Sequence, residues 1–201
     1  MGNQNNLLEK VEYKGYTIEV YSDEFADSPR ENDEMAQFFF FHKKYRLGDE
    51  NPLKAADFSG WEEMEKKLQK EFRLVVPVYM YDHSGISLST TPFSCPWDSG
   101  QIGFACAHAE DIRRTYGVDR ITKKIKDKAL RYIEGEVETY SKYVNGDFCE
   151  YRVFRGAVEI DACYSIEDCE LAVQMGKEHV DIIEDIDAKA LTAAGLEPEP
   201  G

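Results

Sequence analysis

Residues 119–164, DRITKKIKDKALRYIEGEVETYSKYVNGDFCEYRVFRGAVEIDACY, decide the fold class, because a helical pattern passes directly into a hairpin pattern. Over residues 119–143 apolar side chains recur every three or four positions, which predicts a long helix with one buried face. Residues 148–154 and 158–164 flank Arg155-Gly156, and this arrangement is typical of a β-hairpin. A helix followed by a hairpin favours an α+β fold.

The remainder of the chain adds strands before this stretch and a helix after it. Alternating apolar residues at positions 11–21, around Lys14-Gly15, predict another hairpin. Four consecutive aromatic residues at 38–41 predict an element buried on both faces, either a strand or a short helix. Residues 74–81 have the composition of a strand, and Pro77 within it indicates an edge position or a bulge.

These patterns predict an α+β fold with a mixed, mainly antiparallel sheet and three main helices packed on it, at residues 59–72, 119–143 and 165–180. The length of 201 residues and the apolar content of 42% allow one sizeable core, so we expect a single domain over residues 1–185. Residues 186–201 are acidic and end in LEPEPG, which predicts a frayed or disordered tail.

Charge and hydropathy restrict the class of function. The 39 acidic and 24 basic residues give a formal charge of −15, which repels phosphate backbones, so direct nucleic-acid binding is not expected. The charge serves either solubility alone or a surface that occupies the basic nucleic-acid channel of a partner protein. No apolar run reaches the roughly 20 residues of a membrane span and no secretion signal is recognisable, so we expect a cytoplasmic protein without membrane contact.

The cysteines and histidines do not form a metal-binding pattern. Five cysteines, an odd number without a CxxC pair, predict free thiols in a reducing compartment. The four histidines are widely spread, and the chain has no Walker loop, GxGxxG turn or GxSxG elbow. We therefore expect neither a metal nor another cofactor.

The densest group of polar, reactive and turn-forming residues lies at positions 82–101, DHSGISLSTTPFSCPWDSGQ, which we call the 82–101 block. Two glycines, two prolines and a tryptophan within 20 residues predict an ordered, tightly turning loop. Functional loops and structural Ω-loops share this composition, so the composition alone does not separate them.

Two parts of the block, DHSG at residues 82–85 and PFSCPWDSGQ at residues 92–101, resemble the signature of an uncharacterised family encoded by bacteriophages and other mobile elements. The resemblance extends to three further segments: SPRE at 28–31, YRLGD at 45–49 and GEVETY at 135–140. After SPRE the relatives have Trp-Asp-Asn where this chain has Asn-Asp-Glu, so the first segment departs from the pattern. The resemblance implies a protein that acts inside a bacterial host cell and has no settled activity.

Several side chains of the block are candidate site residues. Cys95 is a candidate nucleophile, His83 its base and Asp98 the group that orients the imidazole. The candidate binding residues are Asp82, Trp97, Ser99 and Gln101. An alternative is that Cys95 is buried and His83 hydrogen-bonds the turn. A weaker alternative is a hard divalent metal held by Asp82, His83 and Asp98.

We also expect the block to be packed scaffold at its apolar positions. A loop of about 20 residues without regular structure is uncommon unless its side chains pack and its polar groups are paired. This predicts that Phe93 and Trp97 lie on the sheet, and that Asp98 accepts hydrogen bonds from backbone amides of its own turn.

Two functions of different classes follow. The first is a non-enzymatic accessory protein of a phage or mobile element that binds a host or defence-system protein, for example as an anti-defence inhibitor with an acidic surface. The second is a thiol- or metal-dependent hydrolase or transferase that uses the 82–101 block. The resemblance and the charge favour the first, and the composition of the block is the support for the second.

Overall fold

The computed structural model describes residues 6–193, and the chain divides into two compact units. The first unit combines residues 1–27 with residues 146–201, and the second comprises residues 28–145. The sequence patterns predicted a single domain over residues 1–185 instead. Periodicity identifies single helices and strands. It does not reveal the division into two units, because the chain leaves the first unit after two strands and returns to it only at residue 146.

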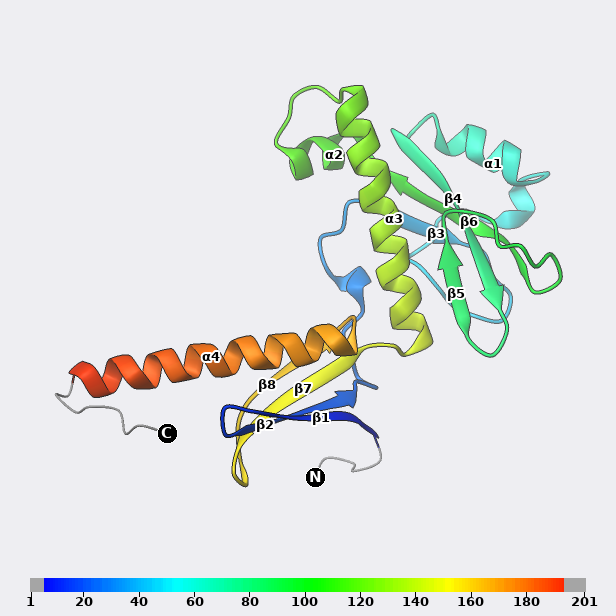
Figure 1. Ribbon diagram of the computed structural model, residues 1–201. Coiled ribbons are helices and arrows are strands. Elements are labelled where there is room, and N and C mark those ends of the chain that lie inside the picture. The colour runs from blue at the N-terminus through cyan, green and yellow to red at the C-terminus, as the bar shows by residue number, and fades with distance from the viewer. Residues whose placement is uncertain (1–5, 194–201) are drawn as a thin grey trace. The chain divides into compact units, whose positions relative to one another are not determined.

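The first unit is a four-stranded antiparallel sheet covered by one helix (Figure 1). Its strands are β1 (Leu7–Tyr13), β2 (Tyr16–Ser22), β7 (Cys149–Arg155) and β8 (Val158–Ile166), in the order β1-β2-β7-β8, and its helix is α4 (Cys169–Ala193). Both predicted hairpins are confirmed, and Lys14-Gly15 at the first turn have the positive φ values of a tight hairpin turn. Gly176 lets α4 approach β2, since a Cβ there would lie 2.7 Å from Ile18 Cγ2.

Helix α4 begins later and ends later than predicted. Asp168 caps it, because Asp168 Oδ1 accepts the backbone N–H groups of Glu170 and Leu171. Ser165, the predicted start, instead joins the end of β8 to residues 23–27 by accepting from Asp27 N and donating its own N–H to Asp23. Residues 186–193, predicted as tail, belong to the helix, and residues 194–201 lie outside the described part.

The expectation of free thiols is wrong for one pair of cysteines. Cys149 and Cys169 form a disulfide across a sequence separation of 20 residues. The hairpin explains the pairing, because Cys149 at the start of β7 is paired with Ile166 at the end of β8, and α4 starts three residues after Ile166. Cys95, Cys106 and Cys163 are free thiols.

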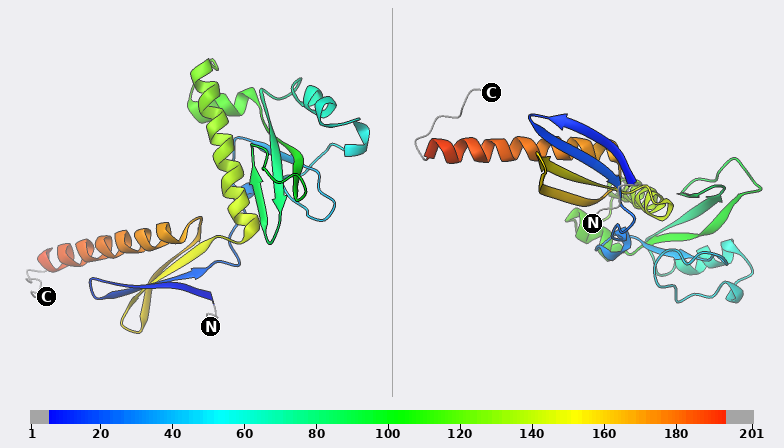
Figure 2. Two further views of the ribbon diagram at one scale, coloured as in Figure 1. Left: turned by 45° about the vertical axis from the view of Figure 1, so that its right-hand side comes forward. Right: turned by 90° about the horizontal axis from the view of Figure 1, so that it is seen from below.

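The second unit has a four-stranded antiparallel sheet with helices on both faces. Its strands are β3 (Gln37–Phe40), β4 (Leu74–Asp82), β5 (Ile86–Ser89) and β6 (Ser99–Ala107), in the order β3-β6-β4-β5. Its helices are α1 (Trp61–Leu68), α2 (Ala109–Tyr116) and α3 (Lys123–Asn145), with 3₁₀ turns at Pro29–Glu31 and Ala55–Asp57. Figure 2 shows α3 and α1 on opposite sides of this sheet.

The aromatic run at residues 38–41 explains why both faces are covered. Phe38 and Phe40 pack in the core beneath α3, whereas Phe39 packs with α1 on the other face. The run is thus a strand buried on both faces, as one of the two predictions had it. Pro77 also fits its prediction, because β5 pairs β4 only from Tyr79 to Asp82 and leaves that edge of β4 open at the proline.

Within residues 6–193 the α+β class is confirmed, with two antiparallel sheets in place of one and with the short helix α2 in addition to three main helices.

Candidate functional site

The 82–101 block consists of the β4–β5 hairpin and the loop that returns the chain to β6. Strand β4 ends at Asp82, and residues 83–85 turn into β5, with Ser84 at a positive φ. The return loop is closed at its base, because the Asp82 amide donates to the Asp98 carbonyl (2.9 Å). Ser99 Oγ donates to the Cys95 carbonyl and closes a tight turn over residues 95–99. Backbone and hydroxyl bonds therefore hold the loop, which explains why it is ordered without a large internal core.

The three candidate catalytic residues meet at one carboxylate. Cys95 Sγ lies 3.8 Å from Asp98 Oδ2, and His83 Nδ1 lies 3.4 Å from the same oxygen. The described residues include no hydrogen bond between Cys95 and His83. A thiol nucleophile needs its base in contact with the sulfur, with the carboxylate behind the imidazole. Here the carboxylate of Asp98 lies between Cys95 and His83, where a catalytic triad has the imidazole. The three residue types are those of a triad, but their spatial order differs from that of a triad.

The cluster also lies on the surface. The side chains of His83 and Asp98 are 62% and 41% exposed, and Cys95 is half-buried. Residues 6–193 contain no group of three or more His, Cys, Asp or Glu side chains placed to hold a metal ion. The metal alternative built on Asp82, His83 and Asp98 therefore has no support from the geometry.

The scaffold prediction is wrong for Trp97 and for Asp98. Trp97 is 91% exposed, and the Asp98 carboxylate contacts His83 and Cys95 where backbone amides of its own turn were expected. Phe93 is half-buried, with its ring 5.7 Å from that of Tyr81. The turn is fixed by its hydrogen bonds, so the indole is not needed as an anchor.

Trp97→Ala should therefore change the free energy of unfolding by less than about 0.5 kcal/mol, because a highly exposed side chain loses little burial when it is removed. Chemical denaturation of both proteins measures this. A loss of 3 kcal/mol or more, roughly the cost of deleting an enclosed aromatic ring, would restore the scaffold interpretation.

The other candidate binding residues hold the site together. Asp82 accepts from Tyr45 Oη (3.2 Å) and lies 3.5 Å from Lys44 Nζ, so it ties the 82–101 block to the loop after β3. Gln101 donates its side-chain N–H to the Gly103 carbonyl within β6. Together with Ser99 they line a hollow of about 370 Å³, whose rim includes Trp97.

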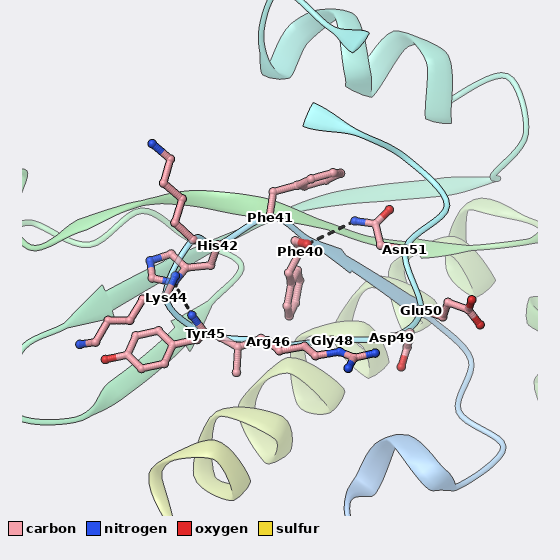
Figure 3. A pocket seen from close by; sticks show the side chains of 12 residues that line it. Phe40, Phe41, His42, Lys44, Tyr45, Arg46, Gly48, Asp49, Glu50 and Asn51 are labelled. Atoms are coloured by element: carbon pink, nitrogen blue, oxygen red, sulfur yellow. Dashed lines mark hydrogen bonds between the residues drawn. The ribbon is translucent and has the colours of Figure 1, made fainter. Parts of the chain in front are cut away.

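A larger pocket of about 780 Å³ adjoins this hollow and was not predicted from the sequence. It is formed by residues 40–51, which curl around the Phe40 ring (Figure 3). Asn51 closes the curl by donating to the Phe40 carbonyl (3.2 Å), and His42 Nδ1 accepts from the amides of Lys44 and Tyr45. His42 lines both the pocket and the hollow. The sequence signal was Lys43, Lys44 and Arg46 within four positions, next to aromatic residues.

The most perturbed carboxylate of the second unit lies away from these hollows. Burial in α3 raises the pKa of Glu136 to about 8, and a hydrogen bond with Glu34 adds to the effect. The same carboxyl group accepts from the amides of Met35 and Ala36, at the entry to β3. Glu136 therefore ties α3 to β3 and is best interpreted as a structural group.

The negative charge is divided unequally between the units. Residues 1–27 and 146–201 hold 20 acidic and 6 basic residues, a formal charge of −14, whereas residues 28–145 hold 19 acidic and 18 basic residues, a formal charge of −1. The basic first half of α3 contributes to this balance, with Lys123, Lys124, Lys126, Lys128 and Arg131. Nearly all of the net negative charge of the sequence therefore lies in the segments that make up the first unit.

Comparison with protein-family models, with curated proteins and with solved structures gave no match. None of the helices within residues 6–193 is both long enough and apolar enough to cross a membrane.

Proposed function

We propose that the protein acts by binding a basic surface of another protein through its first unit. The observation that carries this proposal is the confinement of the formal charge, −14 against −1, to one of two units of the same chain. A charge that served solubility alone would be needed on both units equally, because both are exposed to the same solvent. Charge gathered on one unit instead favours an electrostatic binding surface.

Helix α4 of the acidic unit also exposes apolar side chains that a partner protein could contact. Its sheet-facing side chains, which include Val173 and Val180, are buried. Leu171, Ile182 and Ile186 fall on a different side of the helix at 100° per residue, and they are 43%, 53% and 59% exposed. We call these three residues the α4 stripe. Exposed apolar side chains bordered by charge are typical of protein interfaces.

The charge also restricts the partner. Glu178 and Asp185 lie beside the α4 stripe and repel an equally acidic second copy of this chain as well as a nucleic acid. A basic surface with a central apolar patch complements both features, and nucleic-acid channels of proteins are basic surfaces of this kind. The resemblance of the 82–101 block to a phage-encoded family supports a host or defence-system protein as the partner, in the cytoplasm of a bacterial host.

Affinity capture from bacterial host lysate tests the proposal, with the full chain immobilised. We expect a basic, nucleic-acid-binding protein to be retained, and to be released both by added DNA and by raising the salt from about 50 to about 500 mM, since salt screens exposed charge. Retention that neither DNA nor salt affects, or retention of acidic proteins alone, would contradict the proposal.

A thiol enzyme is the second candidate, because Cys95, His83 and Asp98 do converge on one surface. That function requires Cys95 to react with iodoacetamide faster than free cysteine does at pH 6. Since no hydrogen bond joins His83 to the Cys95 sulfur within the described residues, we expect no such acceleration. Cys163, the other partly exposed free thiol, is the internal control, and mass spectrometry resolves the two sites. Selective labelling of Cys95 at pH 6 would favour the enzyme.

A further inference from the structure

A smaller pocket of about 340 Å³ lies in the second unit, on the face of the sheet that α1 covers. Three parts of the chain line it: β3, residues 50–53, and the end of α1 with the turn that follows. It shares no lining residue with the hollow at Trp97, and it shares Glu50 with the larger pocket. The site described above therefore does not account for this pocket.

The floor of the smaller pocket is apolar. Phe39, Leu68 and Phe72 belong to the cluster that packs against α1, and each is less than 10% exposed. The rings of Phe39 and Phe72 lie 5.6 Å apart, edge to face. Leu53 is half-buried and packs against the same cluster. An apolar ligand chain would therefore meet a surface that offers it no competing polar group.

The wall formed by residues 50–53 is fixed to β3 by hydrogen bonds. The Asp49 amide donates to the Phe38 carbonyl (3.0 Å), and the Asn51 side chain donates to the Phe40 carbonyl (3.2 Å). The Leu53 amide then donates to the Asn51 side chain (3.0 Å). The pocket is thus formed before any ligand arrives, which lowers the cost of binding.

Two carboxylates line this pocket without a partner of their own. Glu50 and Glu71 are exposed, and neither forms an ion pair or a side-chain hydrogen bond within residues 6–193. Asp49, next to Glu50 in the sequence, differs because the Arg30 guanidinium binds it (2.8 Å). None of the described residues that line the pocket is basic. Two negative charges are therefore left to attract a cation.

The surroundings of both carboxylates place their charge at the smaller pocket. Burial raises the pKa of the Cys106 thiol to about 12, and the negative charge of Glu71 adds to this rise. Cys106 in β6 is paired with Gln37, which lines the pocket, so the Glu71 charge acts on the sheet beneath it. Figure 3 shows the Glu50 side chain turned away from the Phe40 ring, and thus out of the larger pocket.

We propose that this pocket binds an aliphatic amine in its ammonium form. Glu50 and Glu71 hold the ammonium group, and the alkyl chain lies on the apolar floor. Contacts between an ammonium group and carboxylates are stronger than those between neutral groups. A bare metal ion fits less well, because residues 6–193 contain no group of three or more His, Cys, Asp or Glu side chains placed to hold one.

The volume of about 340 Å³ lies at the lower end of the range of small-molecule sites, which suits a short chain. The pocket belongs to the near-neutral second unit alone. Binding of an amine there is therefore tested independently of the protein interface proposed for the acidic unit.

Amide chemical shifts of the isotope-labelled full chain test this, with pentylamine, pentanol and pentanoate as separate titrants. The three share one alkyl chain and differ in charge, and about 100 mM salt screens the loose attraction of the acidic unit for any cation. We expect pentylamine to shift the amides of Gln37, Leu53 and Phe72 and to bind with a Kd of about 1 mM or tighter. Pentanol should bind at least about tenfold more weakly, and pentanoate should not bind.

The double variant Glu50→Gln/Glu71→Gln should weaken pentylamine binding about tenfold, because neutral amides replace both charges. Both side chains are exposed, so the fold should persist, and the unshifted amides of the variant verify this. The matched control is Glu62→Gln/Glu134→Gln, which removes two exposed glutamates of the same unit that do not line the pocket. It should leave pentylamine binding unchanged.

Four outcomes would overturn the proposal. The first is a set of pentylamine shifts confined to the acidic unit, which would show loose attraction alone. The second is equal affinity for pentylamine and pentanol, and the third is full pentylamine binding by the Glu50/Glu71 variant. The fourth is binding of a capped lysine tripeptide at least about tenfold more tightly than of pentylamine, which would make a protein side chain, and not a free amine, the source of the ammonium group.

Discussion

Glu136→Gln should stabilise the protein at pH 9 by roughly 2 to 4 kcal/mol and leave its stability at pH 4 nearly unchanged. Burial raises the pKa of Glu136 to about 8 in the folded state, from 4.5 as the ordinary value. The folded protein therefore holds this proton more tightly than the unfolded chain does. The stabilisation is complete below pH 4.5 and is lost as the pH rises through about 8. Glutamine remains neutral, and its one side-chain oxygen can still accept from the amides of Met35 and Ala36, as Glu136 Oε1 does.

Urea denaturation of the wild type and of the variant across this pH range measures the difference. The control is Glu134→Gln, which removes an exposed carboxylate two residues away in the same helix and should not change the pH dependence. If the unfolding free energies of the wild type and of Glu136→Gln stayed parallel from pH 4 to 9, the pKa of Glu136 would be the same in the folded and unfolded states, and the effect of burial on it would be wrong.

Gly103→Ala should cost roughly 3 kcal/mol of stability or more, the upper end of the usual cost of overpacking. Gly103 in β6 is paired with Phe40 in β3, and a Cβ at this position would lie 2.0 Å from the Phe39 carbonyl oxygen. The obstacle is backbone, so β3 would have to move away from β6. That movement would disturb the aromatic residues that fill the core on both faces of the sheet.

Gly100 provides the matched control, because it lies in the same strand and a Cβ there would meet nothing within 4 Å. Thermal denaturation should show a large fall in melting temperature for Gly103→Ala and a small change for Gly100→Ala. Equal effects of the two substitutions would mean that β3 and β6 are not held as closely as described.

Local sequence patterns predicted the helices and strands of this fold, but they did not predict which strands distant in the sequence pair with each other. Alternation around Lys14-Gly15 and Arg155-Gly156 located both hairpins of the first unit, because strand periodicity and turn chemistry act between near neighbours. The pairing of β2 with β7 joins residues on either side of the whole second unit. No periodicity in the chain encodes that pairing, so the sequence patterns led to one domain and one sheet.

The candidate site was predicted in its residues but not in its geometry. The types of Cys95, His83 and Asp98 indicated a cluster, and the structure brings them together. Their order around the carboxylate depends on where the turns place each side chain, which spacing does not reveal. The burial of Trp97 was predicted wrongly for a related reason. Loops have no periodicity that separates a buried ring from an exposed one, so composition favoured packing.

The central claim, that the acidic unit binds a basic partner, is tested most directly by the affinity of the captured partner for two charge-reversed variants. Glu178→Lys/Asp185→Lys changes α4 beside the stripe, and Glu134→Lys/Glu138→Lys changes α3 of the near-neutral unit by the same charge. The variants are matched, because Asp185 and Glu138 each pair with a lysine four residues later. At about 50 mM salt we predict at least about tenfold weaker binding for the α4 variant and unchanged binding for the α3 variant. Equal affinities of the two variants would contradict the claim.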